Sequence, residues 1–178
     1  MFKKILIALV VVVVAFLAFA ATRPATYEVS RSTVVKAPAQ HVFDIINDFH
    51  NFPQWSPWQH LDPNMQVTYS GPQNGVGSAY AWSGNDKAGQ GSMKITEATA
   101  PAKIAMQLDF IKPFASSNTI DFAMAPEGDG TKVTWTMRGT NTFGLKVMSV
   151  FMPMDKMIGP DFEHGLANLK TVAERAQP

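Results

Sequence analysis

In the central part of the chain apolar residues recur at every second position, and this period constrains the fold more than any other feature. Between Met65 and Phe143 the alternation is interrupted at short intervals by glycine, proline and asparagine, which are typical of turns. We therefore expect about six strands in series, each with one apolar and one polar face. Because strands joined by short turns pair as antiparallel neighbours, this region is predicted to form a meander.

The segment in front of the meander predicts one further strand and a short helix. Residues 27–36 are rich in valine and threonine and end before Pro38, which is typical of a strand followed by the first turn of a helix. From His41 to Phe49 the apolar residues recur at steps of three and four, so an amphipathic helix is expected there. Residues 53–63 contain three prolines and two tryptophans and are predicted to form a structured connection.

The C-terminal part of the chain returns to helical spacing. After Pro160, the acidic residues Asp161 and Glu163 would complement the dipole of a first turn, which predicts a terminal helix of about four turns. The apolar stripe of this helix consists of Phe162, Leu166, Leu169 and Ala173. Residues 145–158 are apolar, rich in methionine and interrupted by Pro153, so we expect a kinked or separate helix that could serve as a lid.

These elements predict an α+β domain in which a curved antiparallel sheet of about seven strands wraps around a long C-terminal helix. Sheets of this size are strongly twisted. Since such a sheet cannot close tightly on the narrow stripe of one helix, we expect a cavity between the two.

The chain begins with an apolar segment that is excluded from the domain. Residues 5–21 are 17 uninterrupted apolar residues behind Lys3 and Lys4. At a rise of about 1.5 Å per residue they reach roughly 25 Å as a helix, near the lower limit for crossing a bilayer. The two lysines favour a cytoplasmic N-terminus, so the leading interpretation is a single-pass anchor with the domain outside the cytoplasm.

Cleavage of this segment is the alternative. The small residues Ala18 and Ala20 have the spacing that signal peptidase prefers, and cleavage near Ala20 would release a secreted or periplasmic domain. In either case we divide the chain into an anchor or signal segment (residues 1–21), a linker (22–26) and a ligand-binding domain (27–178).

Composition excludes several classes of function. The chain has no cysteine, which rules out disulfides, thiolate catalysis and cysteine-ligated metals. Without Lys3 and Lys4, 13 of the 15 basic residues remain against 14 acidic ones, so the domain lacks the basic surplus that nucleic-acid binding requires. No two histidines have the helical spacing of metal ligands, and neither a metal nor a cofactor is predicted.

Three features of the sequence carry a resemblance to a known family. They are Pro38 at the start of the first helix, the stretch Asn51-Phe52-Pro53-Gln54-Trp55-Ser56-Pro57-Trp58, and the ending Phe162-Glu163-His164-Gly165-Leu166-Ala167-Asn168-Leu169-Lys170. Over roughly residues 27–175 the chain resembles the polyketide cyclase/dehydrase and lipid-transport family of the START-like, Bet v 1-like superfamily, also called SRPBCC. The resemblance implies a helix-grip fold with a hydrophobic tunnel under the terminal helix. Members of the superfamily range from lipid carriers and hormone receptors to aromatic cyclases.

Inward-facing strand positions and the terminal stripe supply large, soft side chains that could line such a tunnel. Methionine adapts to irregular apolar shapes, and aromatic rings provide large contact areas. The residues expected to bind a ligand are Trp82, Met106, Phe110, Phe122, Trp135, Met137, Phe162 and Leu166. Trp55 and Trp58 could close the mouth of the tunnel, touch lipid headgroups or plug the end of the sheet, and we favour the plug.

The leading functional hypothesis is a membrane-tethered domain outside the cytoplasm that binds a small hydrophobic or amphipathic molecule without chemistry of its own. The second is a cyclase or dehydratase in which Arg138, His164 or Asp161 polarises a carbonyl or moves a proton. The third is a protein-interaction module with a filled core. The enzyme requires an ionisable group that faces the cavity, whereas the binding domain does not.

Overall fold

The computed structural model describes residues 2–175 and contains a seven-stranded antiparallel sheet. Its strands are β1 (Thr26–Val35), β2 (Gln66–Ser70), β3 (Ala79–Ser83), β4 (Gln90–Thr99), β5 (Lys103–Lys112), β6 (Ser116–Glu127) and β7 (Gly130–Thr140). The order across the sheet is β1-β7-β6-β5-β4-β3-β2. The meander predicted from the alternation is thus confirmed, and β1 pairs with β7 to form one edge of the sheet.

The alternation of residues decides which face of the sheet is covered. In β5, Ile104, Met106 and Leu108 are buried, while the residues between them are more exposed. Across the neighbouring strands Phe122 of β6 lies opposite Trp135 of β7, and both are buried. The concave face is therefore largely apolar, whereas Arg138, Asp121 and Glu28 lie together on the convex face.

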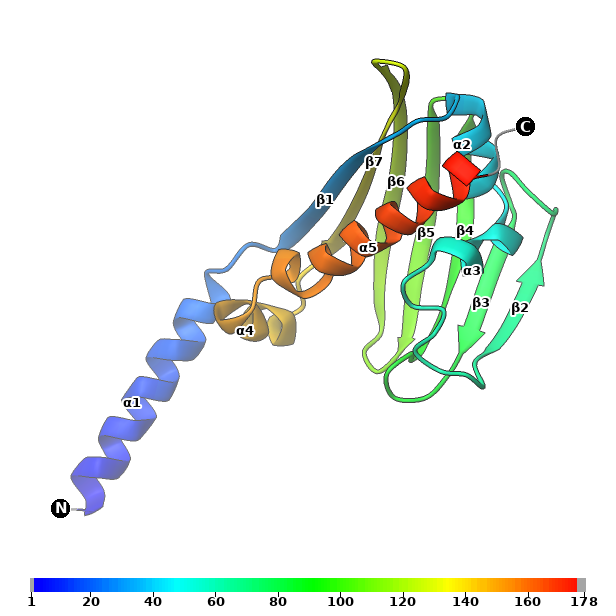
Figure 1. Ribbon diagram of the computed structural model, residues 1–178. Coiled ribbons are helices and arrows are strands. Elements are labelled where there is room, and N and C mark those ends of the chain that lie inside the picture. Colours follow the sequence, from blue (N-terminus) through cyan, green and yellow to red (C-terminus); the bar gives the residue numbers. More distant parts are fainter. Residues whose placement is uncertain (1, 176–178) are drawn as a thin grey trace.

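The helical elements are α1 (Phe2–Ala21), α2 (Ala39–Ile46), the 3₁₀ turn η1 (Phe49–Asn51), α3 (Phe52–Trp55), α4 (Phe143–Phe151) and α5 (Met154–Arg175). Of these, α2, η1, α3 and α5 cover the concave face of the sheet. Figure 1 shows α5 crossing the sheet along its length, with α2 and α3 beside it. This arrangement is the predicted helix-grip fold. The helix α1 projects away from the domain, with α4 beside the end at which α1 joins it (Figure 1).

The terminal helix is longer than the sequence predicts. It begins at Met154, so Pro160 lies inside it, and Asp155 is the acidic residue of its first turn instead of Asp161 and Glu163. A proline inside a helix removes one N–H donor but does not end the helix where packing holds the next turn. The predicted stripe is confirmed, because Phe162, Leu166, Leu169 and Ala173 are all buried. The segment before α5 is a separate helix, α4, capped by the hydroxyl of Thr142, which accepts from the N–H of Leu145.

Arg31 of β1 ties the N-terminal part of α5 to the edge of the sheet. Its guanidinium donates to Asp155 at 2.7 Å and to Glu163 at 2.8 Å. Gly159 permits this approach, since a Cβ there would overlap the guanidinium. The hydrogen bond from Arg31 holds the pKa of Asp155 below its ordinary value, although partial desolvation opposes the shift. The pair therefore stabilises this end of α5 fully at pH values above the ordinary carboxyl pKa. This stabilisation is lost as the pH falls through the lowered pKa of Asp155.

We predict that Arg31→Met loosens the start of α5 with little effect on global stability, because solvent screens exposed ion pairs and leaves each of them a small net contribution. The protection factors for hydrogen exchange, which correct for the intrinsic rate at each pH, should fall at the amides of residues 157–165 in the variant, and in the parent when the pH falls through the pKa of Asp155. Arg138→Met is the matched control, since Arg138 also forms two ion pairs but joins only strands, through Glu28 and Asp121. Equal exchange in α5 for both variants would contradict the prediction.

Candidate functional site: an apolar cavity under the terminal helix

A cavity of about 230 Å³ lies between the concave face of the sheet, the first turns of α5 and the connection that follows α3. Its position follows from how the sheet is covered. The helix α5 packs mainly on β1, at one edge of the sheet, whereas η1, α3 and the connection after α3 line the cavity together with residues of β3, β4 and β5. The lining residues are Ile46, Phe49, Phe52, Trp55, Ser56, Trp58, Gln59, Leu61, Met65, Tyr80, Trp82, Lys87, Ala88, Met93, Met106, Leu108, Phe110, Ile120, Phe122, Trp135, Met137, Ile158 and Phe162.

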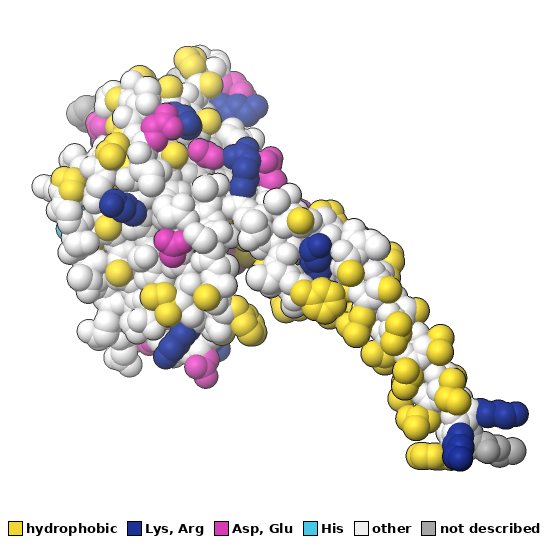
Figure 2. Space-filling model, turned by 180° about the vertical axis from the view of Figure 1, so that it is seen from behind, with side chains coloured by type: hydrophobic (Ala, Val, Ile, Leu, Met, Phe, Trp, Pro, Cys, Tyr) yellow, Lys and Arg dark blue, Asp and Glu magenta, His cyan; other side chains and the backbone are white. Residues whose placement is uncertain are grey.

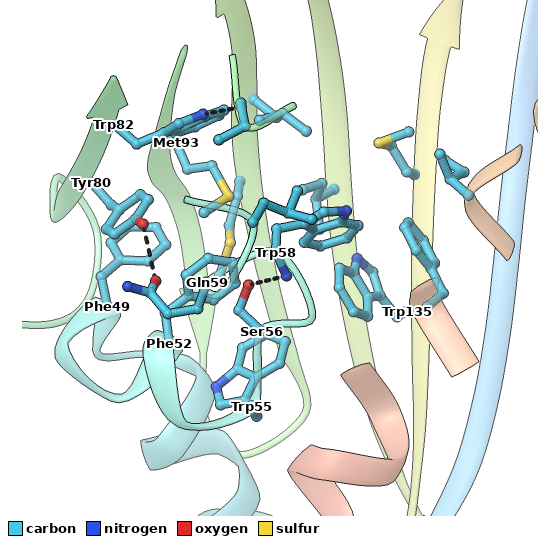
Figure 3. A pocket seen from close by; sticks show the side chains of 18 of the residues that line it. Phe49, Phe52, Trp55, Ser56, Trp58, Gln59, Tyr80, Trp82, Met93 and Trp135 are labelled. Atoms are coloured by element: carbon cyan, nitrogen blue, oxygen red, sulfur yellow. Dashed lines mark hydrogen bonds between the residues drawn. The ribbon is translucent and has the colours of Figure 1, made fainter. Parts of the chain in front are cut away.

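Aromatic rings form the wall on the side of α5, and Trp135 is at their centre. Its indole stacks on the ring of Phe162 with centroids 4.1 Å apart, and it meets Trp58 and Trp55 edge to face at 5.7 Å each. Figure 3 shows Trp55, Trp58 and Trp135 close together on this side of the cavity. Edge-to-face and offset pairs at these distances are favourable geometries, so the rings of the wall stabilise one another.

A glycine in α5 brings the helix close to this wall. A Cβ at Gly165 would lie 2.8 Å from the indole of Trp135 and 3.2 Å from the ring of Pro57. Any larger side chain would therefore push α5 away from β7. The close approach fixes the position of α5 beside the cavity.

Few polar groups reach the cavity. The hydroxyl of Tyr80 donates to the side-chain carbonyl of Gln59 at 3.4 Å, and the hydroxyl of Ser56 accepts from the backbone N–H of Trp58 at 3.3 Å (Figure 3). Burial, together with the neighbouring Tyr69, raises the pKa of Tyr80 to about 12, so its hydroxyl stays protonated at neutral pH. The hydroxyl and amide groups of Tyr80, Gln59 and Ser56 are thus neutral hydrogen-bonding groups. Among the described residues of the lining, Lys87 is the one cationic side chain.

Two indole N–H groups of the wall lack a hydrogen-bond partner. The Nε1 atoms of Trp55 and Trp135 are buried and make no hydrogen bond within the described part of the chain, whereas Trp82 donates from Nε1 to the carbonyl of Ala88 at 3.0 Å. A buried donor without a partner carries a desolvation cost of about 1–3 kcal/mol. The wall therefore contains two unpaired donors that are fully buried within it.

Seven of the eight residues predicted to bind a ligand line this cavity. They are Trp82, Met106, Phe110, Phe122, Trp135, Met137 and Phe162. Leu166 is buried in the core one turn beyond Phe162 and is not among the lining residues, because Gly165 seats this turn of α5 directly on the sheet. That these side chains bind a ligand stays a prediction.

Three residues considered for catalysis lie elsewhere. Arg138 is on the convex face and pairs with Glu28 and Asp121, while Asp161 and His164 lie on α5 outside the cavity lining. Within residues 2–175, the lining contains neither a histidine nor an acidic residue. The same part of the chain holds no cluster of histidine and acidic side chains that could ligate a metal ion.

Two expectations about the surroundings of the cavity were wrong. Trp55 and Trp58 do not plug the end of the sheet but form part of the cavity wall, because α3 and the following turn lie over Trp135. The proposed lid, residues 145–158, contributes only Ile158 to the lining. The part of this segment in α4 lies against α1, where the rings of Phe151 and Phe16 are 5.5 Å apart.

The lining residues that the sequence reasoning missed come mainly from the segment between β1 and β2. Phe49, Phe52, Trp55 and Trp58 supply aromatic rings at intervals of three residues, and each of them faces the cavity. This spacing is the signal that could have found them. Tyr80 and Met93 also line the cavity, on strands whose alternation already predicted an inward face.

The fold and the cavity define a helix-grip domain of the Bet v 1-like type, with the architecture of hydrophobic-ligand-binding and cyclase/dehydrase-like proteins. Residues 26–174 match the family described as polyketide cyclase/dehydrase and lipid transport. Because the match spans most of the chain, the protein belongs to this family.

Solved structures agree with this assignment at the level of the fold. Protein CV1439 from Chromobacterium violaceum is 15% identical with a TM-score of 0.59, and the alignment covers 85% of this chain and 98% of that one. Protein MLL2253 from Mesorhizobium loti is 11% identical with a TM-score of 0.62, covering 85% and 100%. Ara h 8.0201 is 11% identical with a TM-score of 0.55, covering 84% and 96%. A search among curated proteins found no match.

The cavity predicts a difference between two similar substitutions. Met106 on β5 and Met124 on β6 are both buried, but only Met106 lines the cavity. We expect Met106→Phe to cost less than about 1 kcal/mol, because the ring has room, whereas Met124→Phe overpacks the core and costs about 1–3 kcal/mol. Denaturant unfolding of the two variants measures both values. Equal costs would mean that the space beside Met106 is filled.

Proposed function

We propose that this protein binds a small hydrophobic or amphipathic ligand in the cavity under α5, as a membrane-tethered domain outside the cytoplasm. The observation that carries the proposal is the cavity itself, enclosed by aromatic and methionine side chains and with few polar groups. Protein interiors are normally packed without voids larger than a water molecule, so a cavity of this size needs an explanation. A hydrophobic ligand is the simplest explanation in a family that is described by cyclase and lipid-transport activities.

The size of the cavity limits the ligand. A volume of about 230 Å³ is slightly below the roughly 300–1,000 Å³ of common ligand pockets, and it equals about eight water-sized groups at ~30 Å³ each. One or two rings, or a short acyl chain, would fit without rearrangement. Met93, Met106 and Met137 line the sheet side, and their flexible side chains allow moderate expansion.

The polar groups favour a ligand with one hydrogen-bonding end. Gln59, Tyr80 and Ser56 supply the polar atoms of the lining, while Met106, Leu108 and Phe110 provide an apolar surface on β5. Burial of apolar ligand surface contributes roughly 25 cal/mol per Å² before the entropy of association is subtracted. The polar end would then fix the orientation of the ligand and contribute less to affinity.

A tethered location rests on α1. This helix has 20 residues and is apolar and long enough to cross a membrane, although a signal sequence has the same properties. Apart from Ala20, its residues are not buried by the domain. A helix with apolar side chains on all sides is stable only in a nonpolar environment, which favours a membrane span. Lys3 and Lys4 at its start favour a cytoplasmic N-terminus.

A cyclase or dehydrase reaction is the second candidate, and the pair of Tyr80 and Gln59 favours it. A protonated phenol that faces an apolar cavity can donate a hydrogen bond to a substrate carbonyl. Arg138, Asp161 and His164 cannot take part without a rearrangement, because they lie outside the lining. The interaction module with a filled core loses its support, since the core contains a cavity.

We predict that ligand binding changes the fluorescence of the protein, because all four tryptophans line the cavity. The full chain in lipid nanodiscs is titrated with a medium-chain fatty acid that carries a terminal bromine, which quenches nearby indoles. Quenching should be saturable in the parent and shifted to at least about tenfold higher concentration in Met106→Phe, a loss of about 1.4 kcal/mol. Met124→Phe is the control and should bind like the parent. Unsaturable quenching that is equal in all three proteins would show that the probe only dissolves in the lipid.

A second prediction concerns topology, and the absence of cysteine makes it simple to test. In intact cells a membrane-impermeant maleimide should label Asp129→Cys, in the turn before β7, and should label Phe2→Cys only after lysis. A full-length labelled chain that stays in the membrane fraction supports the anchor. A shortened, soluble chain would show cleavage, and labelling of Phe2→Cys in intact cells would show the opposite orientation.

A further inference from the structure

The helix α4 is apolar, and yet none of its residues 143–151 is buried. Its exposed side chains are large: Phe151 is 78% exposed, Phe143 53% and Met148 42%. Met152, in the link to α5, is also 53% exposed. Surface helices normally bury an apolar stripe and present polar residues to water. The only charged residue of α4 is Lys146, so the helix lacks a face suited to water.

The neighbour of α4 is the projecting helix α1. The rings of Phe151 and Phe16 meet with centroids 5.5 Å apart, and Ala20, one turn beyond Phe16, is completely buried. The ammonium group of Lys146 donates to the carbonyl of Ala21 at 3.4 Å, at the C-terminal end of α1, where a cation interacts favourably with the helix dipole. The two helices therefore pack against each other where α1 joins the domain (Figure 1).

The apolar surface of α1 continues onto this region. In Figure 2 the hydrophobic side chains cover the projecting helix and extend to the neck where it meets the domain, whereas the rest of the visible surface is polar or mixed. Isolated exposed apolar side chains are common, but a continuous apolar surface marks contact with another apolar phase. Because the apolar surface of α1 continues onto α4, the nonpolar environment that surrounds α1 would also reach α4.

We propose that α4 lies in the interface of the same phospholipid bilayer that α1 spans, with Met148, Phe151 and Met152 among the acyl chains. The proposal rests on the membrane anchor of the proposed function. Short helices with aromatic and large aliphatic side chains bind at this depth, where the rings sit below the headgroups. Lys156 follows these side chains at the start of α5, and its long stem lets the ammonium group reach the lipid phosphates.

This contact would place the cavity beside the membrane. The helix α5 begins three residues after α4 ends, and Ile158 and Phe162 in its first turns line the cavity. Arg31 holds the same turns to β1. A domain held by α1 and α4 together has a fixed orientation toward the bilayer, whereas a domain on a single tether would rotate freely. A hydrophobic ligand would then pass between the lipid and the cavity over a short path.

The proposal is tested by measuring the depth of single labels in the full chain, which has no cysteine of its own. Met148→Cys and Phe151→Cys are labelled with an environment-sensitive fluorophore, and the protein is reconstituted into vesicles of phosphatidylcholine and phosphatidylglycerol. Val11→Cys in α1 is the positive control, and Asp129→Cys, at the opposite end of β7 from α4, is the negative control. All four positions are exposed to the surroundings of the protein, so the substitutions leave the core intact.

Brominated lipids should reduce the emission at positions 11, 148 and 151 by at least about twofold and leave position 129 unchanged. Quenching at 11 without quenching at 148 and 151 would overturn the role of α4 and leave the anchor standing. Absence of quenching at 11 would instead show that the anchor itself is wrong, and the proposal would fall with it. A label at 148 that is shielded from both brominated lipid and aqueous iodide would show that α4 contacts protein, which also overturns the proposal.

Discussion

The stacking of Phe162 on Trp135 is the contact on which the rest of the domain depends. It joins the terminal helix to the sheet at a centroid distance of 4.1 Å, and Gly165 permits it by leaving room for the indole. Once α5 is seated on β7 and β1, it cannot also cover β3, β4 and β5. The close packing on one side of the sheet thus produces the cavity on the other.

The cavity combines aromatic rings with methionine side chains, and this combination suits a binding site. The wall near α5 consists of aromatic rings with several mutual contacts. Met93, Met106 and Met137 also line the cavity, and methionine adopts many conformations at low cost. Tyr80 and Gln59 add neutral hydrogen-bonding groups. The aromatic rings can select the shape of a ligand, while the methionine side chains accommodate variation in its length.

Much of the fold could be predicted from the sequence, but less of the site. Alternation assigned Met106, Phe122 and Trp135 to the inner face, because a strand exposes successive side chains to opposite faces. The aromatic residues before β2 were not recognised as a wall, because an irregular segment has no period that reports its orientation. Leu166 belongs to the predicted stripe, but the period of a helix does not tell which turn meets the core and which meets a cavity.

The sequence by itself determined the strands, their order along the chain, the apolar stripe of the last helix and the apolar segment at the start. These follow from local spacing and composition, which act within a few residues. Only the tertiary structure decided where α5 begins, which inward side chains line the cavity, and that α4 lies against α1 instead of over the cavity. The physical reason is that a pattern shows which face of an element avoids water, whereas the partner that covers this face is chosen by packing between residues far apart in the chain.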